Sequence, residues 1–556
     1  MKHHGSAMAV VAFLTTLAAT GDVLAVDSKA DWVRFLEQSS FGPTPVDIQD
    51  WRTIGFDAWL NTQHQLPASR FPDLPAFPAN QNLGCPATLV NAAQCKRDHY
   101  TLYPLQVQFF RNALSAPDQL RLRVAYTLSQ IFVVSGLQIR QPSSMAPYLN
   151  ILVDGALGNF RDLLEKMTLN PAMGDYLDMV NNDKPSADGR VQPNENYARE
   201  VLQLFSIGLY QLNADGSQKM AADGTPLPAY DQVAIEGFAH AFTGWTYATL
   251  AGSTPKAHNP ANYLQPMEVY RKNGVDVNHD KQAKHLLSYP GATHELLAAG
   301  QTAETDLQYA LDNIFHHPNV GPFISTQLIQ SLVTSNPSPA YIARVASIFN
   351  DNGSGIRGDL FATVRAVLID PEARGSSTKP PHFGRLREPV LFLTTLLRAL
   401  EASSDGALAN QTKAMGQDLF NAPSVFSYYP RPYQIPNSDL QGPEFGIESS
   451  STTLTRHNLV NTLVYSRINS PTPDTGTELG WTRLDPLAQL KESGPLLSYL
   501  DQNLMHGTLS PDMRSIIAGA LSCRIKTGQS VCSNGRERAT TALYLIATSA
   551  AYQIQR

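Results

Sequence analysis

The 556-residue sequence lacks most features that would assign a function directly. It has only four cysteines, a formal net charge of −6 and no run of lysines or arginines. Because binding to nucleic acid or to an anionic membrane depends on clustered positive charge, we expect neither as a partner. After the amino-terminal segment no stretch of about 18 apolar residues occurs, so we expect no membrane span.

The amino terminus predicts a secretory signal peptide over residues 1–25. A short basic start precedes the apolar run "AMAVVAFLTTLAA" from Ala7, and Val23-Leu24-Ala25 is a small-residue cleavage pattern. An uncleaved anchor is the alternative, but the flanking charges do not form a stop-transfer pattern. We therefore expect an exported chain of residues 26–556 that is secreted or periplasmic.

The cysteines fall into two local pairs, Cys85 with Cys95 and Cys523 with Cys532. An oxidising compartment favours a disulfide within each pair, although other pairings stay possible if the two ends of the chain meet. A zinc site would require closer C-x-x-C spacing and nearby histidines. Thiol catalysis is disfavoured because all four cysteines are expected in disulfides.

Signature motifs of common enzymes are missing too. There is no G-x-S-x-G turn, no P-loop, no G-x-G-x-x-G after a strand and no H-E-x-x-H helix. The sequence assigns no metal or cofactor. Chemistry by two carboxyl groups of separated pKa values, as in glycoside cleavage, stays open.

Helical periodicity dominates what is present. It recurs in segments such as 28–41, 117–136 and 148–170, and Thr44-Pro45 is a good cap and first-turn pair for a helical stretch over 44–64. The predicted fold class is mainly α: a large multi-helical assembly, either one domain over 26–556 or two packed lobes with a boundary near 375–385.

One small β-hairpin insertion is expected over 208–231. Asp215-Gly216 and Asp223-Gly224 lie between short alternating runs there, as in tight turns. A calcium loop is the alternative for such acidic turns, but no Glu falls six residues after Gly216.

Several motifs occur in one order along the chain. They include "WVRFLEQSSFGPTPVDIQDWRTIGFDAWLNTQ", "LRVAYTLSQIFVVSG", "PNENYAREVLQLFSIGL", "LIDPEAR" and "APSVFSYYPRPY". From about Ala30 onward the sequence resembles the bacterial family catalogued as domain of unknown function 1800. The resemblance implies an exported helical protein. It also implies a partner, a sulfatase-like exported protein catalogued as domain of unknown function 1501.

The first candidate site is the segment 193–210, polar in its first half and apolar in its second. A helical wheel places on one face Asn196, Arg199, Glu200 and Gln203. Glu195 and Arg199 stand at i, i+4, the spacing of a helical ion pair. The face is either a solvated surface or a wall that grips a polyhydroxylated or anionic ligand. In the second case Glu195 or Glu200 is the acid or base, Arg199 orients the substrate, and Asn196 contacts it.

The second candidate, "VNHDKQAKHLL", holds His279, Asp280, Lys284 and His285. An adjacent His and Asp can bind a metal or act as a base and its orienting group, but only in a loop, since neighbours do not share a helix face. The pattern also resembles the family's histidine-aspartate pair with a following lysine. A capped turn before a helix is the alternative.

In "DQVAIEGFAHAFTGWTY", Glu236 and His240 stand at i, i+4, and Trp245 packs in the core or lines a substrate pocket. Zinc would require at least three protein ligands. Family members often carry a small or apolar residue at the position of His240, which argues against a catalytic role for it.

The last candidate is "APSVFSYYPRPYQIPNS", where Tyr428, Tyr429 and Arg431 follow one another in a proline-punctuated segment. Aromatic faces and an arginine suit a sugar-binding wall with a donor for carboxylate or sulfate groups. The alternative is an irregular buried segment that seals one end of the bundle.

Two functions fit these patterns. The first is an extracytoplasmic enzyme that cleaves or modifies polysaccharide, with Glu195, Glu200 and Arg199 at the site and His279 with Asp280 as an auxiliary base or metal site. The second is a non-catalytic glycan-binding or scaffolding partner of the sulfatase-like protein.

Overall fold

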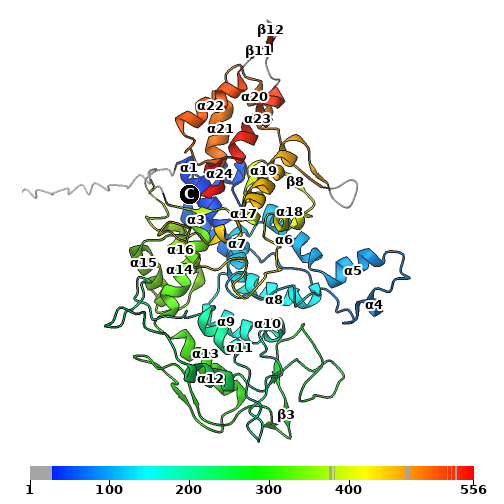
Figure 1. The fold of residues 1–556 in the computed structure, drawn as a ribbon, viewed down its shortest axis with the longest axis vertical. Coiled ribbons are helices and arrows are strands. Elements are labelled where there is room, and N and C mark those ends of the chain that lie inside the picture. Colours follow the sequence, from blue (N-terminus) through cyan, green and yellow to red (C-terminus); the bar gives the residue numbers. More distant parts are fainter. Residues whose placement is uncertain are drawn as a thin grey trace, which may run out of the picture.

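The computed structural model describes residues 28–374, 379–380, 382–469, 476–522, 524–526, 529–531 and 535–556. Helices are the dominant element of the described chain, and its strands form only small two- or three-stranded sheets, which confirms the predicted mainly α class (Figure 1). The expected signal peptide and the Cys523–Cys532 pair lie outside the described residues. In the part of the chain that the structure describes, no helix has the length and apolar character needed to cross a membrane.

The first helices surround the centre of the molecule. They are α1 (Lys29–Ser39), α2 (Pro45–Trp51), α3 (Phe56–Gln65), α4 (Gln81–Gly84), α5 (Ala92–Tyr100), α6 (Tyr103–Ser115), α7 (Gln119–Ser129), α8 (Pro142–Gly155), α9 (Phe160–Thr168), α10 (Pro171–Tyr176), α11 (Asn196–Gln203) and α12 (Gln232–Ala241). Side-chain caps begin several of them: Ser28 accepts from the Asp31 amide and Thr44 from the Asp47 amide, as the Thr44-Pro45 pattern predicted.

The remaining helices continue around the core and then form a lobe at one end. They are α13 (Ala303–Phe315), α14 (Val320–Leu332), α15 (Pro339–Asn350), α16 (Leu360–Ile369), α17 (Pro389–Ala399), α18 (Ala409–Ala414), the 3₁₀ helix η1 (Pro443–Ile447), α19 (Ser450–Tyr465), α20 (Leu484–Gln489), α21 (Gly494–Leu504), α22 (Pro511–Leu521), α23 (Gly535–Ala547) and α24 (Ala550–Gln553). Figure 1 shows α20 to α23 together at the top.

Strands are short, and they pair antiparallel in sheets of two or three. The pairs are β1 (Trp245–Thr246) with β2 (Glu268–Val269), β3 (Arg271–Lys272) with β4 (Val275–Asp276), β5 (Lys284–His285) with β6 (Leu296–Leu297), β7 (Arg385–Leu386) with β13 (Ile554–Gln555), and β11 (Arg524–Lys526) with β12 (Gln529–Val531). The three-stranded sheet joins β8 (Ser403–Ser404), β10 (Gly476–Glu478) and β9 (Ile468–Asn469).

The expected insertion over 208–231 is a compact double turn rather than a regular hairpin. Single bridges join Tyr210 to Pro228, Leu212 to Gln218, and Met220 to Pro226. Both predicted turns are present, since Gly216 and Gly224 adopt φ values of 77° and 84° that only glycine reaches without strain.

Two expected helical stretches are interrupted. The stretch over 44–64 is two helices because Gly55 turns the chain at φ 89° between α2 and α3. The polar stretch 193–210 is helical only over α11, so its apolar second half, including Phe205, lies beyond the helix end.

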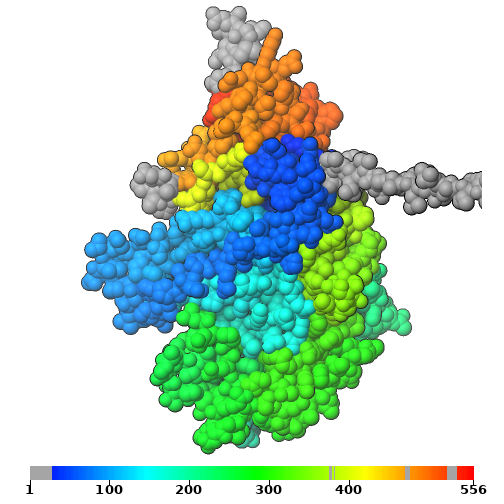
Figure 2. All heavy atoms as spheres, turned by 180° about the vertical axis from the view of Figure 1, so that it is seen from behind, coloured from blue at the N-terminus to red at the C-terminus, as the bar shows by residue number. Residues whose placement is uncertain are grey.

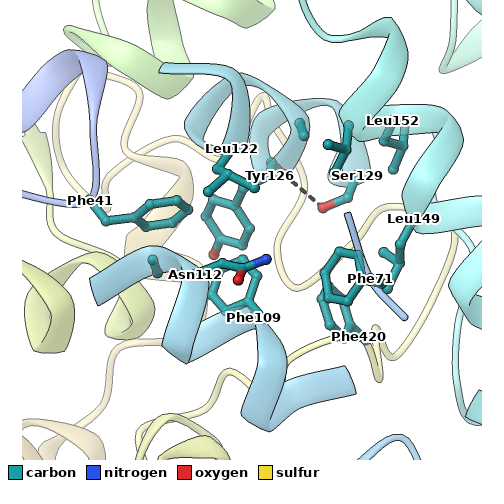
Figure 3. Close-up of a pocket in the computed structure, with 13 residues that line it drawn as sticks. Phe41, Phe71, Phe109, Asn112, Leu122, Tyr126, Ser129, Leu149, Leu152 and Phe420 are labelled. Atoms are coloured by element: carbon teal, nitrogen blue, oxygen red, sulfur yellow. Dashed lines mark hydrogen bonds between the residues drawn. The ribbon is translucent and has the colours of Figure 1, made fainter. Parts of the chain in front are cut away.

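One continuous hydrophobic cluster runs from Trp32 to Tyr552 and joins the first described helix to the last. Figure 3 shows a small void inside it, where Phe109 and Tyr126 face Phe71 and Phe420. The void measures about 20 Å³ and its walls are almost wholly apolar. A space of about one water molecule without polar partners is a packing gap, so it is no candidate for a ligand site.

An arm projects from the body between α3 and α6. It carries α4 and α5 and is closed by the Cys85–Cys95 disulfide, which confirms the first predicted pair. Figure 2 shows this blue arm standing away from the body. The side chain at its tip, Val90, is 98% exposed.

Candidate functional site

His240, near the end of α12, is partly exposed and contacts one of the predicted site residues. Its side chain is 27% exposed, and its Nδ1 contacts Oδ2 of Asp280. Asp280 is held in turn by the Gln282 amide at 2.9 Å, while its own amide donates to Thr243 Oγ1. Burial alone would raise the pKa of Asp280, but these hydrogen bonds and Lys284 bring it below the ordinary value. The pair therefore has the arrangement of an imidazole ring oriented by a carboxylate.

His279, the predicted auxiliary base, is not placed to act on a ligand. It is fully buried, its Nε2 lies 3.0 Å from Oδ2 of Asp306, and its Nδ1 lies 2.9 Å from the Thr243 carbonyl oxygen. The capped turn before a helix that was the alternative is not found either, because the segment leads into strand β5. The orienting role expected for Asp280 toward a base is directed at His240 instead. Asp306, on α13, was not singled out from the sequence because it stands alone in an ordinary helical pattern.

Lys284 is also structural. It is buried, its Nζ lies 2.7 Å from Oδ2 of Asp306, and it donates to the carbonyl oxygen of Asp280. The expected substrate contact by this lysine finds no support in the geometry, because the side chain is buried and its ammonium group is paired with Asp306. His285 next to it is exposed on β5, where its carbonyl oxygen would lie only 1.7 Å from a Cβ added to Gly237.

The polar face of α11 divides into an exposed and a buried part. Glu195 and Arg199 form the predicted ion pair at 2.7 Å, and both are partly exposed. Gln232 on α12 donates to Oε1 of Glu195 at 2.9 Å and to Glu236 at 3.2 Å. The amide of Asn196 donates to Asp178 at 3.1 Å. These groups form a continuous polar surface across the starts of α11 and α12.

Glu200 is the unusual member of this helix. It is 8% exposed, and its Oε2 is buried without a hydrogen-bond partner in the described chain. Burial raises its pKa above the ordinary value, and Arg199 only partly offsets that effect. Burial and the nearby carboxyl group of Glu200 raise the pKa of two tyrosines, Tyr176 and Tyr230. The pKa of Tyr230 rises to about 12, mainly because of burial. A carboxyl group that stays protonated above its usual range is suited to donate a proton.

The loop before α11 brings the two predicted segments into one neighbourhood. Asn182 accepts from the Asn194 amide at 2.8 Å and donates to its carbonyl oxygen at 3.0 Å, which closes the loop at its base. Lys184 donates its amide to the Asn278 carbonyl oxygen at 2.8 Å, beside Asp280. The loop therefore lies between the start of α11 and the segment of the His240–Asp280 pair.

The remaining aromatic candidates point into the protein. Trp245 is buried on β1. The hydroxyl of Tyr429 donates to Glu388 at 3.0 Å, and that of Tyr428 donates to the Asp418 carbonyl oxygen at 3.1 Å. Their inward direction favours the buried-segment interpretation over a sugar-binding wall. Of the candidates in this segment, only Arg431 lines a cavity. That cavity lies at the carboxyl end of α11, whereas Glu195 lies at the amino end.

A groove along α8 was missed from the sequence. Two cavities of about 790 and 690 Å³ share Ser143, Tyr263 and Leu264, so they form one trough. The arm residues 70–81 line one side and residues 261–266 the other; in Figure 2, cyan atoms of α8 lie between the blue arm and the green lobe. No local motif marks it, because its walls come from segments nearly 200 positions apart.

The groove ends beside α11. Tyr263 donates to Asp175 at 2.5 Å, and Asp178, three positions on, accepts from Asn196. Three residues span at most about 11 Å, so the end of the groove and the polar face of α11 adjoin.

Nearly the whole described chain matches a known family. The model of a protein family of unknown function, DUF1800, matches residues 34–554. The chain belongs to the DUF1800 family. No curated protein and no solved structure matches it. Membership of DUF1800 therefore agrees with the motif resemblance but assigns no chemistry, which has to come from the site itself.

Histidine and aspartate side chains at the candidate site of this DUF1800 chain are distributed in pairs. Within the described ranges, no three His, Cys, Asp or Glu side chains converge as metal ligands would. His240, Asp280, His279 and Asp306 are instead used in two separate pairs.

Proposed function

We propose that this protein is an extracytoplasmic enzyme that cleaves polysaccharide bound in the α8 groove. The observation that carries the proposal is Glu200, a buried carboxyl group with an unpartnered oxygen and a raised pKa on α11, the helix whose exposed polar face adjoins the groove. A glycosidase needs such a group to protonate the leaving oxygen.

The groove suits an extended sugar chain. It offers aromatic rings with hydroxyl tips, Tyr100 and Tyr263, together with charged groups of both signs such as Arg140 and Asp154. Aromatic faces bind the apolar faces of sugar rings, and the polar groups accept and donate hydrogen bonds to hydroxyls. An open trough, unlike a closed pocket, admits a polymer.

The reaction assigned to these groups is hydrolysis. The protonated carboxyl of Glu200 gives its proton to the glycosidic oxygen as the C–O bond breaks, and water adds to the sugar carbon and gives its proton to His240. Gln232, Glu236 and His240 stand at i, i+4 and i+8, which aligns them on one stripe of α12, and Gln232 contacts Glu195 of α11. Asp280 holds the His240 ring, and Arg199 is free on one side to bind a substrate hydroxyl or carboxylate.

The test is the release of reducing ends from a panel of neutral and anionic polysaccharides. The disulfide-intact protein, residues 26–556, is compared with Glu200→Gln and with Glu401→Gln, an exposed control whose partner is Arg483. We expect Glu200→Gln to lose about a hundredfold or more of kcat, the range for general acid catalysis, while Glu401→Gln is unchanged. Equal rates of the wild type and Glu200→Gln, or no release from any substrate, would refute the proposal.

A second candidate function rests on the arm. Its tip exposes Leu83, Leu89 and Val90 together within ten residues, an apolar surface of a kind that binds proteins. A non-catalytic glycan-binding or scaffolding role with a sulfatase-like partner would use this tip. Binding of that partner to the wild type, and its loss in Leu83→Ser/Val90→Ser, would support this role. Unchanged binding in the variant would exclude the arm.

A further inference from the structure

A separate cavity of about 400 Å³ lies at the carboxyl end of α11, away from Glu195 and the groove. It is enclosed by the turn after α11, the double turn near Gly216, helix α14 and the segment 425–432. Its volume is within the range of small-molecule sites in proteins. Neither the proposed hydrolysis nor the groove uses it.

Most of its wall is apolar. Buried Ile131 and Ile207 line the interior, with Leu204 and Phe323 beside them. The mouth exposes Leu209, Tyr210 and Phe426 to solvent. Phe426 turns outward and Tyr429 inward because Ser427 between them adopts a left-handed φ of 63°. An apolar ligand body is therefore the match for these walls.

One side of the cavity carries buried donors that lack acceptors. Arg431 donates through Nη1 to Ser331 at 2.6 Å, but its Nη2 is buried without a partner in the described chain. Gln327, only 7% exposed, likewise has a buried Nε2 without a partner. Leaving one such buried donor unsatisfied costs about 1–3 kcal/mol. A ligand with an acceptor atom inside the cavity would remove this cost for both donors.

The buried residues behind this wall include more guanidinium groups than carboxylates. Three guanidinium groups, those of Arg123, Arg385 and Arg431, lie in one buried cluster with the carboxylates of Glu388 and Glu444. Both carboxylates are engaged by Arg385, at 3.4 and 2.5 Å. No Asp or Glu lines the cavity. Of these five charged groups only Arg431 lines the cavity, and its Nη2 has no partner in the described chain.

We propose that this cavity binds an amphipathic monocarboxylate, with the carboxylate on Arg431 and Gln327 and the apolar body against Ile131, Leu204 and Phe323. A single carboxylate supplies the one missing charge and accepts from both orphaned donors. An arginine fork and an amide are suited to a planar carboxylate. A neutral sugar would leave the arginine unpaired and the apolar walls unused.

The experiment is calorimetric titration of the full chain of residues 26–556 with octanoate, phenylacetate and 1-octanol. Octanoate and phenylacetate separate an alkyl from an aromatic body, and octanol keeps the apolar body but removes the charge. The variants are Arg431→Gln and Gln327→Leu, with Arg365→Gln as the matched control, because Arg365 pairs at the surface with Asp57 outside the cavity lining.

We expect at least one of the two carboxylates to bind with a dissociation constant below 1 mM, and octanol at least tenfold more weakly. Arg431→Gln should weaken carboxylate binding at least tenfold and Gln327→Leu severalfold, while Arg365→Gln binds as the wild type does. Binding of neither carboxylate overturns the proposal, and so does equal binding of octanoate and octanol. If Arg431→Gln does not fold, Gln327→Leu and the octanol comparison decide alone. These readouts are independent of glycan cleavage.

Discussion

Glu388 is predicted to be the most sensitive single position of the buried network. Its Oε2 accepts from Tyr126 at 3.0 Å, Gln130 at 2.9 Å, Gln417 at 2.6 Å and Tyr429 at 3.0 Å, and the residue is 1% exposed. The change to test is Glu388→Gln, which keeps the shape and removes the charge. In this variant, the most favourable side-chain orientation places the amide oxygen toward the four donors and the NH₂ group toward Arg385.

The cost follows from these contacts. A hydrogen bond to a charged group contributes about 1 kcal/mol more than one to a neutral group, so the four bonds together lose about 4 kcal/mol. Breaking a buried ion pair by removing one partner independently costs about 3–5 kcal/mol. The two figures agree, and we expect the free energy of unfolding to fall by about 4 kcal/mol.

Urea unfolding at pH 7 measures this loss, with Glu401→Gln as the exposed control expected to change stability by less than about 1 kcal/mol. The slope of the free energy of unfolding against urea concentration should stay the same, because the variant keeps the folded shape. A loss below 1 kcal/mol at Glu388 with an unchanged slope would refute the reasoning, because it would mean that the network gains nothing from the charge.

Other changes test other parts of the structure. Glu37 is buried against Arg387 and His506; burial alone would raise its pKa, but these partners hold it below the ordinary value, as Arg385 does for Glu388. Both therefore add stability that is complete above the unfolded carboxyl pKa of about 4.3 and is lost as the pH falls through the folded pKa. The midpoint of thermal unfolding should drop more steeply between pH 5 and 3 in the wild type than in Glu37→Gln, and parallel curves would contradict this. Cys85→Ala/Cys95→Ala should destabilise the arm by about 3 kcal/mol, from the entropy of a loop closed by residues 10 positions apart, seen as faster proteolysis within 72–101 and not elsewhere. His279→Ala should lower global stability by about 3 kcal/mol, whereas His240→Gln should leave it within about 1 kcal/mol and reduce glycan cleavage; the reverse pattern would restore His279 as the base. Gly237→Ala should destabilise by more than about 2 kcal/mol because the new methyl group meets the His285 carbonyl oxygen, and a neutral result would show that α12 can move away from β5.

The fold class, the arm disulfide and the Glu195–Arg199 pair were predictable because each rests on local spacing. The ends of the helices were less predictable. Hydrophobic periodicity continues past Gly55 and past Gln203, although the helices are broken there. The site was predictable only in pieces. His279 and Asp280 are adjacent in sequence yet turn in different directions, one toward Asp306 of α13 and the other toward His240 of α12. Such pairings depend on tertiary packing across 27 and 40 positions, as does the groove, and no single segment encodes them.

The Arg387 cluster also sets an order of events during synthesis. Arg387 donates to Glu37 at 2.8 Å and to the Tyr552 carbonyl oxygen, and Glu37 meets His506, 469 positions later; Figure 1 shows the end of the chain beside α1. At about 5–20 residues per second, a ribosome needs about 20–90 s to reach His506 after it has added Glu37. Throughout that interval the carboxylate and the apolar face of α1 lack their native neighbours. The nascent chain therefore has to be kept from aggregation until nearly its last turn has been made, and this requirement favours expression with holding chaperones.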